Sequence, residues 1–176
     1  MIVLGIDPGL ASTGYGVVEA QGAGVAALDS GVIMTRAEDV LERRLALLYN
    51  GLVKLIEEYG FDAVALETLY FGQNVRTAFA VGQARGVCMV AAGERNLPCA
   101  SYTPQQVKSA VSGYGHASKD QVARMVQSIL GMASMPISDH ASDALAVAIC
   151  HINTGPWASA IAAATAAALR SPSRDL

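Results

Sequence analysis

Two acidic residues each close an apolar segment of the chain. Asp7 follows residues 2–6 and is followed at once by Pro8 and Gly9, which force a turn. Taken alone, this pattern fits an ordinary turn as well as a functional site. Glu67 ends a second apolar segment in the same way. If the two segments are neighbouring parallel strands, the carboxylates lie roughly 5 Å apart and repel each other without a cation, which predicts a metal site.

Further possible metal ligands lie at the start of the helix expected from Ser138. His140 and Asp143 are three residues apart, which places both on one face of a helix. Asp139 is out of phase with His140, and the helix dipole explains an acidic residue at that position. A histidine here is by itself more often an ordinary surface residue. Beside the two strand-end carboxylates and Asp143, a metal-binding role is favoured.

Alternating strand and helix patterns must position these residues. Short Gly-rich turns separate three strand-like segments, which predicts an antiparallel meander over residues 2–6, 15–18 and 25–33. Leucines at spacings of three and four then predict a helix over 41–60. The apolar run at 62–66 follows as a buried strand, most simply parallel to the first one after the helical crossover.

The second half of the chain continues the alternation. We expect a helix over residues 75–95, a short strand over 99–102 and a helix starting at Thr103-Pro104. A capping box at Ser118 to Gln121 starts another helix, and the last begins near Ser138. The order is therefore βββαβαβ followed by helices. It predicts an α/β fold with a mixed five-stranded sheet flanked by helices.

Composition fits a single domain. The 176 residues are 52% hydrophobic and 15% charged with a net charge of −3, which excludes extended disorder and a uniformly basic nucleic-acid coat. The charge is uneven, however. Residues 68–124 hold six basic and two acidic residues, a net charge of +4, so a local basic surface remains open.

We expect one folded domain over residues 1–153 and an Ala-rich tail over 154–176 that forms a marginal helix or is disordered. The three cysteines form no metal-type cluster. The N-terminus lacks the features of a secretion signal, and the longest apolar stretch is too short for a bilayer. These features favour a cytoplasmic protein.

Six motifs in order resemble the RuvC family of bacterial Holliday junction resolvases. They are Gly5-Ile6-Asp7-Pro8-Gly9, Gly14-Tyr15-Gly16, Leu66-Glu67, Gly82-Gln83-Ala84-Arg85-Gly86, Tyr102-Thr103-Pro104-Gln105-Gln106-Val107-Lys108 and Ser142-Asp143-Ala144-Leu145-Ala146. The resemblance runs from residue 1 to about residue 151. It implies a ribonuclease H-like nuclease domain that acts as a homodimer, in which each subunit nicks one of two opposed strands of four-way junction DNA with Mg²⁺. It also implies partnership with the RuvA/RuvB branch-migration complex.

The resemblance assigns roles to individual residues. Asp7, Glu67 and Asp143 match three acidic residues of the family's catalytic site, and His140 falls where many members have a further Asp. Two Mg²⁺ ions held ~4 Å apart would activate a water and stabilise the leaving oxygen, with Asp7 as the bridging ligand. Because histidine brings no negative charge, we expect weaker Mg²⁺ binding and ready acceptance of Mn²⁺. The alternative is that Asp139 swings into the site.

Basic and aromatic residues complete the expected site. By resemblance, Lys108 and Lys119 lie near the cleaved phosphate, although both could be plain surface lysines. The chain has only three lysines, and two of them at matching positions favour function. Tyr70 matches an aromatic residue that inserts at the junction. Arg76 and Arg85 are candidate phosphate contacts on charge and position alone.

These residues predict a metal-dependent, structure-selective endonuclease. One alternative is a module that binds branched DNA without cutting it. Another is an ATP-binding protein of the actin or sugar-kinase type, in which a similar Gly-x-Asp-x-Gly segment before a meander holds phosphates. That class needs two such domains, and the chain has one copy of the motif.

Overall fold

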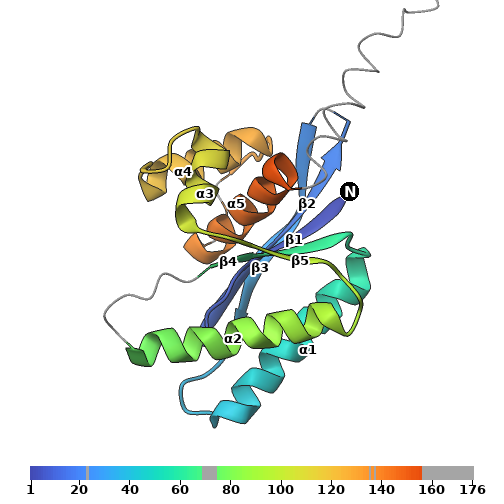
Figure 1. Ribbon diagram of the computed structural model, residues 1–176, viewed down its shortest axis with the longest axis vertical. Helices are drawn as coiled ribbons and strands as arrows, with labels where there is room; N and C mark the ends of the chain where they lie inside the picture. The colour runs from blue at the N-terminus through green and yellow to red at the C-terminus, as the bar shows by residue number, and fades with distance from the viewer. Residues whose placement is uncertain (23, 69–74, 135, 137, 156–176) are drawn as a thin grey trace, which may run out of the picture.

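A computed structural model describes residues 1–22, 24–68, 75–134, 136 and 138–155 (Figure 1). The elements in chain order are β1 (Ile2–Asp7), β2 (Ser12–Gln21), β3 (Gly24–Met34), α1 (Leu41–Tyr59), β4 (Ala63–Glu67), α2 (Val75–Gly93), β5 (Cys99–Tyr102), α3 (Pro104–Ser112), α4 (Lys119–Ile129) and α5 (Asp139–Thr154). This order confirms the prediction of βββαβαβ followed by helices. The Ala-rich run of the expected tail lies outside the described residues.

The five strands form one mixed sheet in the order β3-β2-β1-β4-β5. β1 pairs antiparallel with β2 and parallel with β4, as expected. In the parallel pair Ile6 is opposite Leu66, so Asp7 and Glu67 follow paired residues at the same edge of the sheet. β2 is longer than its apolar pattern predicts, because pairing with β1 and β3 extends it through its glycines.

The sheet is the middle of three layers (Figure 1). On one face α1 and α2 pack side by side, and their buried residues, including Leu48 and Leu52, share a core with Leu4 and Ile6 of β1. On the other face α5 crosses the strands, with α3 and α4 packed against it. Here Leu145 of α5 is fully buried. Helices cover both faces of β1, so its last residue, Asp7, reaches solvent at the end of the strand.

Two glycines of β2 let α5 approach the sheet at backbone distance. A Cβ atom at Gly14 would lie 2.0 Å from the carbonyl oxygen of His140, and one at Gly16 would lie 2.7 Å from the amide nitrogen of Leu145. A side chain at either position would push the helix away. The Gly14-Tyr15-Gly16 motif therefore holds the first turns of α5 beside the end of β1.

Helix caps fix where the last three helices begin. Thr103 and Ser118 each accept a hydrogen bond from the amide of the third helical residue, a glutamine, whose side-chain oxygen accepts one from the amide of the capping residue. The capping box predicted at Ser118 is thus confirmed, and Thr103 forms a second one. Ser138 caps α5 through the amide of Ala141. Among the described residues, none of the helices combines the length and apolar character needed to cross a membrane.

Candidate active site

Asp7 and His140 meet at the end of β1, although 133 residues separate them in the chain. Nδ1 of His140 lies 2.7 Å from Oδ2 of Asp7. A carboxylate only accepts hydrogen bonds, so Nδ1 carries the proton and donates it to Asp7. In the neutral imidazole the lone pair then remains on Nε2. The His140 side chain is 47% exposed, so its ring is in contact with solvent.

Glu67 lies beside the same group and carries the clearest electrostatic signature of the site. Burial raises its pKa from 4.5 to about 7, and the charges of Asp7 and Asp143 and a hydrogen bond with Asp7 add to the effect, against a smaller opposing influence of Lys119. Burial also raises the pKa of Asp143, although Lys119 acts in the opposite direction. The three carboxyl groups therefore repel one another when they are ionised. A bound cation would neutralise this excess negative charge.

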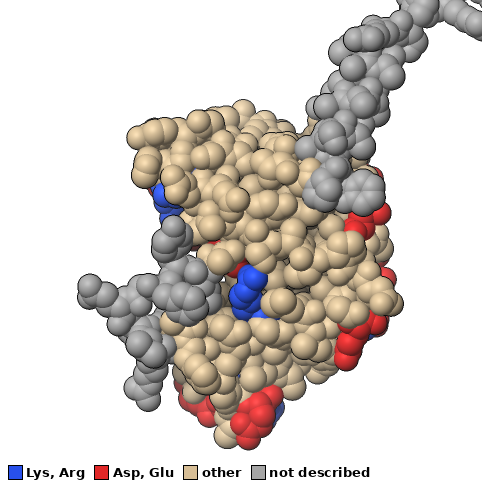
Figure 2. All heavy atoms as spheres, in the orientation of Figure 1, with Lys and Arg blue, Asp and Glu red and all other residues tan. Residues whose placement is uncertain are grey.

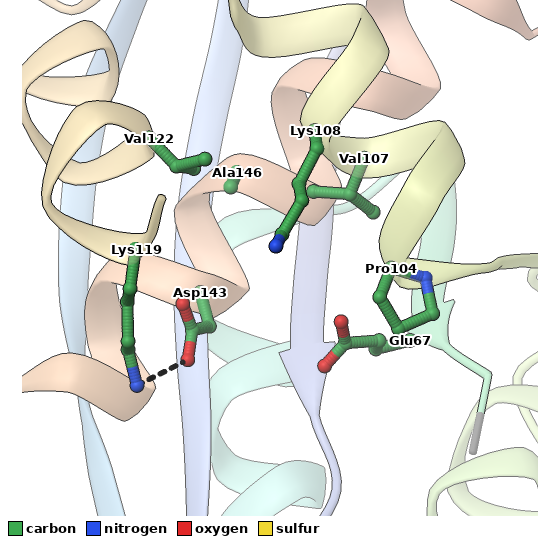
Figure 3. Close-up of a pocket in the computed structure, with 8 residues that line it drawn as sticks. All are labelled: Glu67, Pro104, Val107, Lys108, Lys119, Val122, Asp143 and Ala146. Carbon is green, nitrogen blue, oxygen red and sulfur yellow. Dashed lines mark ion pairs between the residues drawn. The ribbon is translucent and has the colours of Figure 1, made fainter. Parts of the chain in front are cut away.

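Lys119, the first residue of α4, neutralises part of this charge. Its Nζ lies 3.1 Å from Asp143 and 3.2 Å from Asp139, and Figure 3 shows the pair with Asp143. Asp139 is mostly exposed, at 81% of its side chain. Of the two alternatives for the fourth ligand, the structure therefore places His140 beside Asp7 and holds Asp139 on Lys119.

A hollow of about 200 Å³, here called the lysine hollow, opens beside these carboxylates (Figure 3). It is lined by Glu67, Pro104, Val107, Lys108, Lys119, Val122, Asp143 and Ala146. The ammonium group of Lys108 points into it, in the space between Asp143 and Glu67. Figure 2 shows basic and acidic atoms next to each other in a depression on this face of the molecule. Both lysines singled out in the sequence thus lie with the two acidic residues.

A second and wider hollow, about 540 Å³, opens beside Asp7 and His140 and is here called the arginine hollow. It is lined by Asp7, Pro8, Gly9, Leu10, Ala11, Ser12, Arg44, Ala80, Val81 and His140. Sequence reasoning did not single out Arg44. Its only signal is a charged residue near the start of an otherwise leucine-rich helix, which is the usual composition of an exposed helix face.

The three remaining predicted DNA contacts have different outcomes. Tyr70 and the side chain of Arg76 lie outside the described residues. Arg85 is partly buried, and its guanidinium donates to the carbonyl oxygen of Glu67 at 3.1 Å and to Oγ of Ser101 at 2.6 Å. Arg85 therefore braces the ends of β4 and β5, and its contact with DNA stays a prediction.

The side chains of the site have the right chemistry for the expected cation but are not gathered around one point. As the side chains stand, no three His, Cys, Asp or Glu residues within the described ranges are gathered closely enough to hold a metal ion. Asp143 is turned to Lys119, and Asp7 accepts from His140. The set is nonetheless of the right kind, because three carboxylates supply the oxygen ligands that Mg²⁺ prefers and an imidazole suits Mn²⁺. The repulsion between the carboxyl groups supports the same fit.

Comparison with known proteins identifies the family. The family model described as crossover junction endodeoxyribonuclease RuvC matches residues 3–151. The chain belongs to the RuvC family. It is 50% identical over 157 residues to RuvC of Moorella thermoacetica, covering 89% of this chain and 94% of that protein. RuvC of Thermomicrobium roseum is 50% identical over 151 residues, covering 86% and 92% of the two chains.

Solved structures agree with this membership. A structure titled "T. thermophilus RuvC in complex with Holliday junction substrate" has 38% sequence identity and a TM-score of 0.83, covering 86% of this chain and 92% of that one. The yeast mitochondrial Holliday junction resolvase Ydc2, 16% identical with a TM-score of 0.64, shares the fold. The predicted RuvC resemblance and the mixed α/β fold are thus confirmed. The actin-like and binding-only alternatives are not favoured.

Proposed function

We propose that this RuvC-family nuclease resolves Holliday junctions by nicking two opposed strands of a four-way DNA junction. The observation that carries the proposal is that Asp7 and Asp143 lie close enough to Glu67 for their charges to raise its pKa, while two lysines line the hollow beside Glu67 and Asp143. The related Thermus thermophilus protein, seen with a Holliday junction substrate, supports the choice of substrate. The reaction is hydrolysis of a phosphodiester bond.

Mg²⁺ is the cation we propose, held by the three carboxylates with His140 as a further ligand. Bound there, it would activate a water molecule and offset the charge that develops on the phosphate. His140 is suited to this role because its bond to Asp7 fixes the ring and leaves the lone pair of Nε2 outward. Mn²⁺ should serve as well, because imidazole is a better ligand for it than for Mg²⁺.

The two lysines bind and neutralise the reacting phosphate. Lys108 has no ion pair among the described residues, and its ammonium group points into the lysine hollow, so a phosphate oxygen is a ready partner. Lys119 holds Asp143 and Asp139 in the resting protein. If Asp143 held a cation instead, Lys119 would be released to bind the DNA. Lys119 thus links cation binding to phosphate binding.

A homodimer is proposed because two opposed strands have to be cut. α2 buries Ala84, Cys88, Ala91 and Ala92 against the sheet, yet its opposite face is apolar too. That outer face exposes Phe79, Met89 and Val90, and Cβ atoms at Gly82, Gly86 and Gly93 would meet no described atom within 4 Å. A helix that is apolar all round is typically buried, and small residues allow a second helix to approach closely. We infer that α2 packs against α2 of a second copy.

Sedimentation of a Val90→Lys variant tests this interface. We expect a monomer that still binds divalent cations but no longer makes paired nicks, while the distant surface variant Met34→Lys stays dimeric. A Val90→Lys protein that remains a dimer would exclude this face. Partnership with the RuvA/RuvB branch-migration complex stays a prediction from family resemblance.

Cleavage of a synthetic four-way junction tests the proposed function. We expect symmetric paired nicks in the junction with Mg²⁺ or Mn²⁺ and none in a linear duplex of the same sequence. Asp7→Asn removes a cation ligand while keeping the side-chain shape, and it should abolish cleavage but preserve junction binding. Absence of cleavage with either cation, or full activity of Asp7→Asn, would contradict the nuclease mechanism.

A further inference from the structure

We propose that the arginine hollow is a second phosphate subsite, in which Arg44 binds the phosphate next to the one that is cut. The inference rests on the proposed nuclease function. Nothing in the sequence motifs or the family match assigns a role to this hollow or to Arg44. The ligand is an internal phosphodiester of the cleaved DNA strand.

The position of the hollow is the first reason. The candidate cation ligands form a partition between two openings, with Glu67 and Asp143 lining the lysine hollow and Asp7 and His140 lining the arginine hollow. A phosphate that reacts at this partition belongs to a continuous strand. That strand must leave the reacting centre on both sides, and each side carries a further phosphate. The lysine hollow accommodates one direction, and the arginine hollow is the opening on the other.

The way Arg44 is held is the second reason. Its Nε donates to Oγ1 of Thr35 at 2.9 Å, and that hydroxyl donates to the carbonyl oxygen of Leu10 at 2.5 Å. One edge of the guanidinium is thereby fixed to the loop that follows Asp7. Its terminal nitrogens make no ion pair with any acidic residue in the part of the chain that the structure describes. A fixed guanidinium with its terminal donors free is well suited to bind a phosphate.

The surroundings of Arg44 also favour an anion. Thr35 binds the carbonyl oxygens of both Leu10 and Ala11, through its hydroxyl and its amide. These two carbonyl oxygens, which would otherwise repel a phosphate, are thus already hydrogen-bonded to Thr35. Ala80 and Val81 of α2 also line the hollow, and they can contact a sugar without adding charge. Asp7 is the acidic residue that lines the hollow, and a cation bound at Asp7 would remove its repulsion.

Neutral phosphate analogues test the inference directly. Single methylphosphonates are placed at each of the two phosphates on either side of the cleavage site of a four-way junction. Single-turnover cleavage is then measured with Mg²⁺, with the enzyme in excess over the junction but below saturation. For wild type we expect one position at which the analogue slows cleavage about tenfold, the size of one charged hydrogen-bonded contact. In Arg44→Ala the same analogue should slow cleavage less than twofold, because the contact is already lost.

The effect of Arg44→Ala at each methylphosphonate position distinguishes a phosphate contact from a structural role. If Arg44 served only to hold the loop, Arg44→Ala would slow cleavage of every analogue by the same factor, and the inference would be wrong. Arg44→Lys, which keeps the charge, should restore part of the sensitivity at that position. Arg43→Ala is the matched control, since Arg43 is exposed, pairs with Asp39 and does not line the hollow. It should behave as wild type at every position.

Salt dependence of junction binding gives a second readout, measured without divalent cations. Loss of one phosphate contact should make the slope of log K against log salt concentration shallower by about one in Arg44→Ala, with no change in Arg43→Ala. Equal slopes in all three proteins would overturn the inference while leaving the nuclease function intact. If wild type neither binds nor cuts the junction, the proposed function itself fails, so the two failures are distinguishable.

Discussion

Glu67→Gln should stabilise the protein at high pH while destroying its activity. The pKa of Glu67 rises from 4.5 to about 7 on folding, chiefly through burial and then through Asp7 and Asp143. Below pH 4.5 the group is protonated in both states. Between these two values the folded protein keeps a proton that the unfolded chain has lost, so the free energy of unfolding falls as pH rises. Above pH 7 Glu67 is ionised in both states, and the free energy of unfolding is lowered by the full cost of burying its charge.

The size of this cost follows from the two pKa values. Their difference corresponds to about 3 kcal/mol at pH 8, and partial exposure of the side chain reduces the expected gain to about 2–3 kcal/mol. At pH 5 the same calculation gives a stabilisation of less than about 1 kcal/mol for Glu67→Gln. For a domain of this size, the midpoint of thermal unfolding should rise by about 5–10 °C at pH 8.

Thermal unfolding of both proteins in EDTA at pH 5 and pH 8 measures the effect. Glu38→Gln is the matched control, because Glu38 is exposed in a turn and should change stability little at either pH. Mg²⁺ should narrow the gap at pH 8, because it compensates the charge of wild-type Glu67. A Glu67→Gln protein no more stable than wild type at pH 8, or equally stabilised at pH 5, would refute the idea that the carboxylates are held together against their repulsion.

Four further substitutions test how the site is positioned. Gly14→Ala should lower the free energy of unfolding by at least about 2 kcal/mol in chemical denaturation, because its methyl group would meet the His140 carbonyl oxygen. Ser118→Ala should cost about 1 kcal/mol in the same assay by removing the cap of α4. His140→Ala should slow Mg²⁺-dependent cleavage at least about tenfold while Asp139→Ala changes it less than about twofold. The reverse order would make Asp139 the ligand.

Most of the fold could be predicted because local signals agree with the tertiary structure. Apolar runs that end at Asp7 and Glu67 mark neighbouring strand ends, and the capping residues Thr103 and Ser118 mark helix starts within a residue. These features depend on spacing along the chain. The sequence pattern predicts too short a β2, because its glycines have low strand propensity. They belong to the strand because they pair with β1 and β3.

The sequence predicted the acidic, histidine and lysine members of the site, but not the individual contacts between side chains. The bond between His140 and Asp7 joins residues from opposite ends of the domain, and no spacing rule describes such a contact. Arg85 was expected to face DNA, but its bonds to the Glu67 carbonyl and to Ser101 depend on how α2 lies over the sheet. Arg44 gave no signal, because its place in the arginine hollow depends on Thr35 and on the loop after Asp7. Pairwise contacts of this kind require the assembled structure.

The backbone contact between α5 and the glycines of β2 has a consequence for anyone who wishes to re-engineer the enzyme. Most sites can be widened or tightened gradually, by exchanging the side chains that separate a helix from a sheet. Gly14 and Gly16 have no side chain that could be exchanged, because the backbone of α5 lies directly on them. The separation between the end of β1 and the first turns of α5 is therefore fixed by backbone contact. A different cation preference would have to come from replacing the proposed ligands themselves, with His140 the first position to vary.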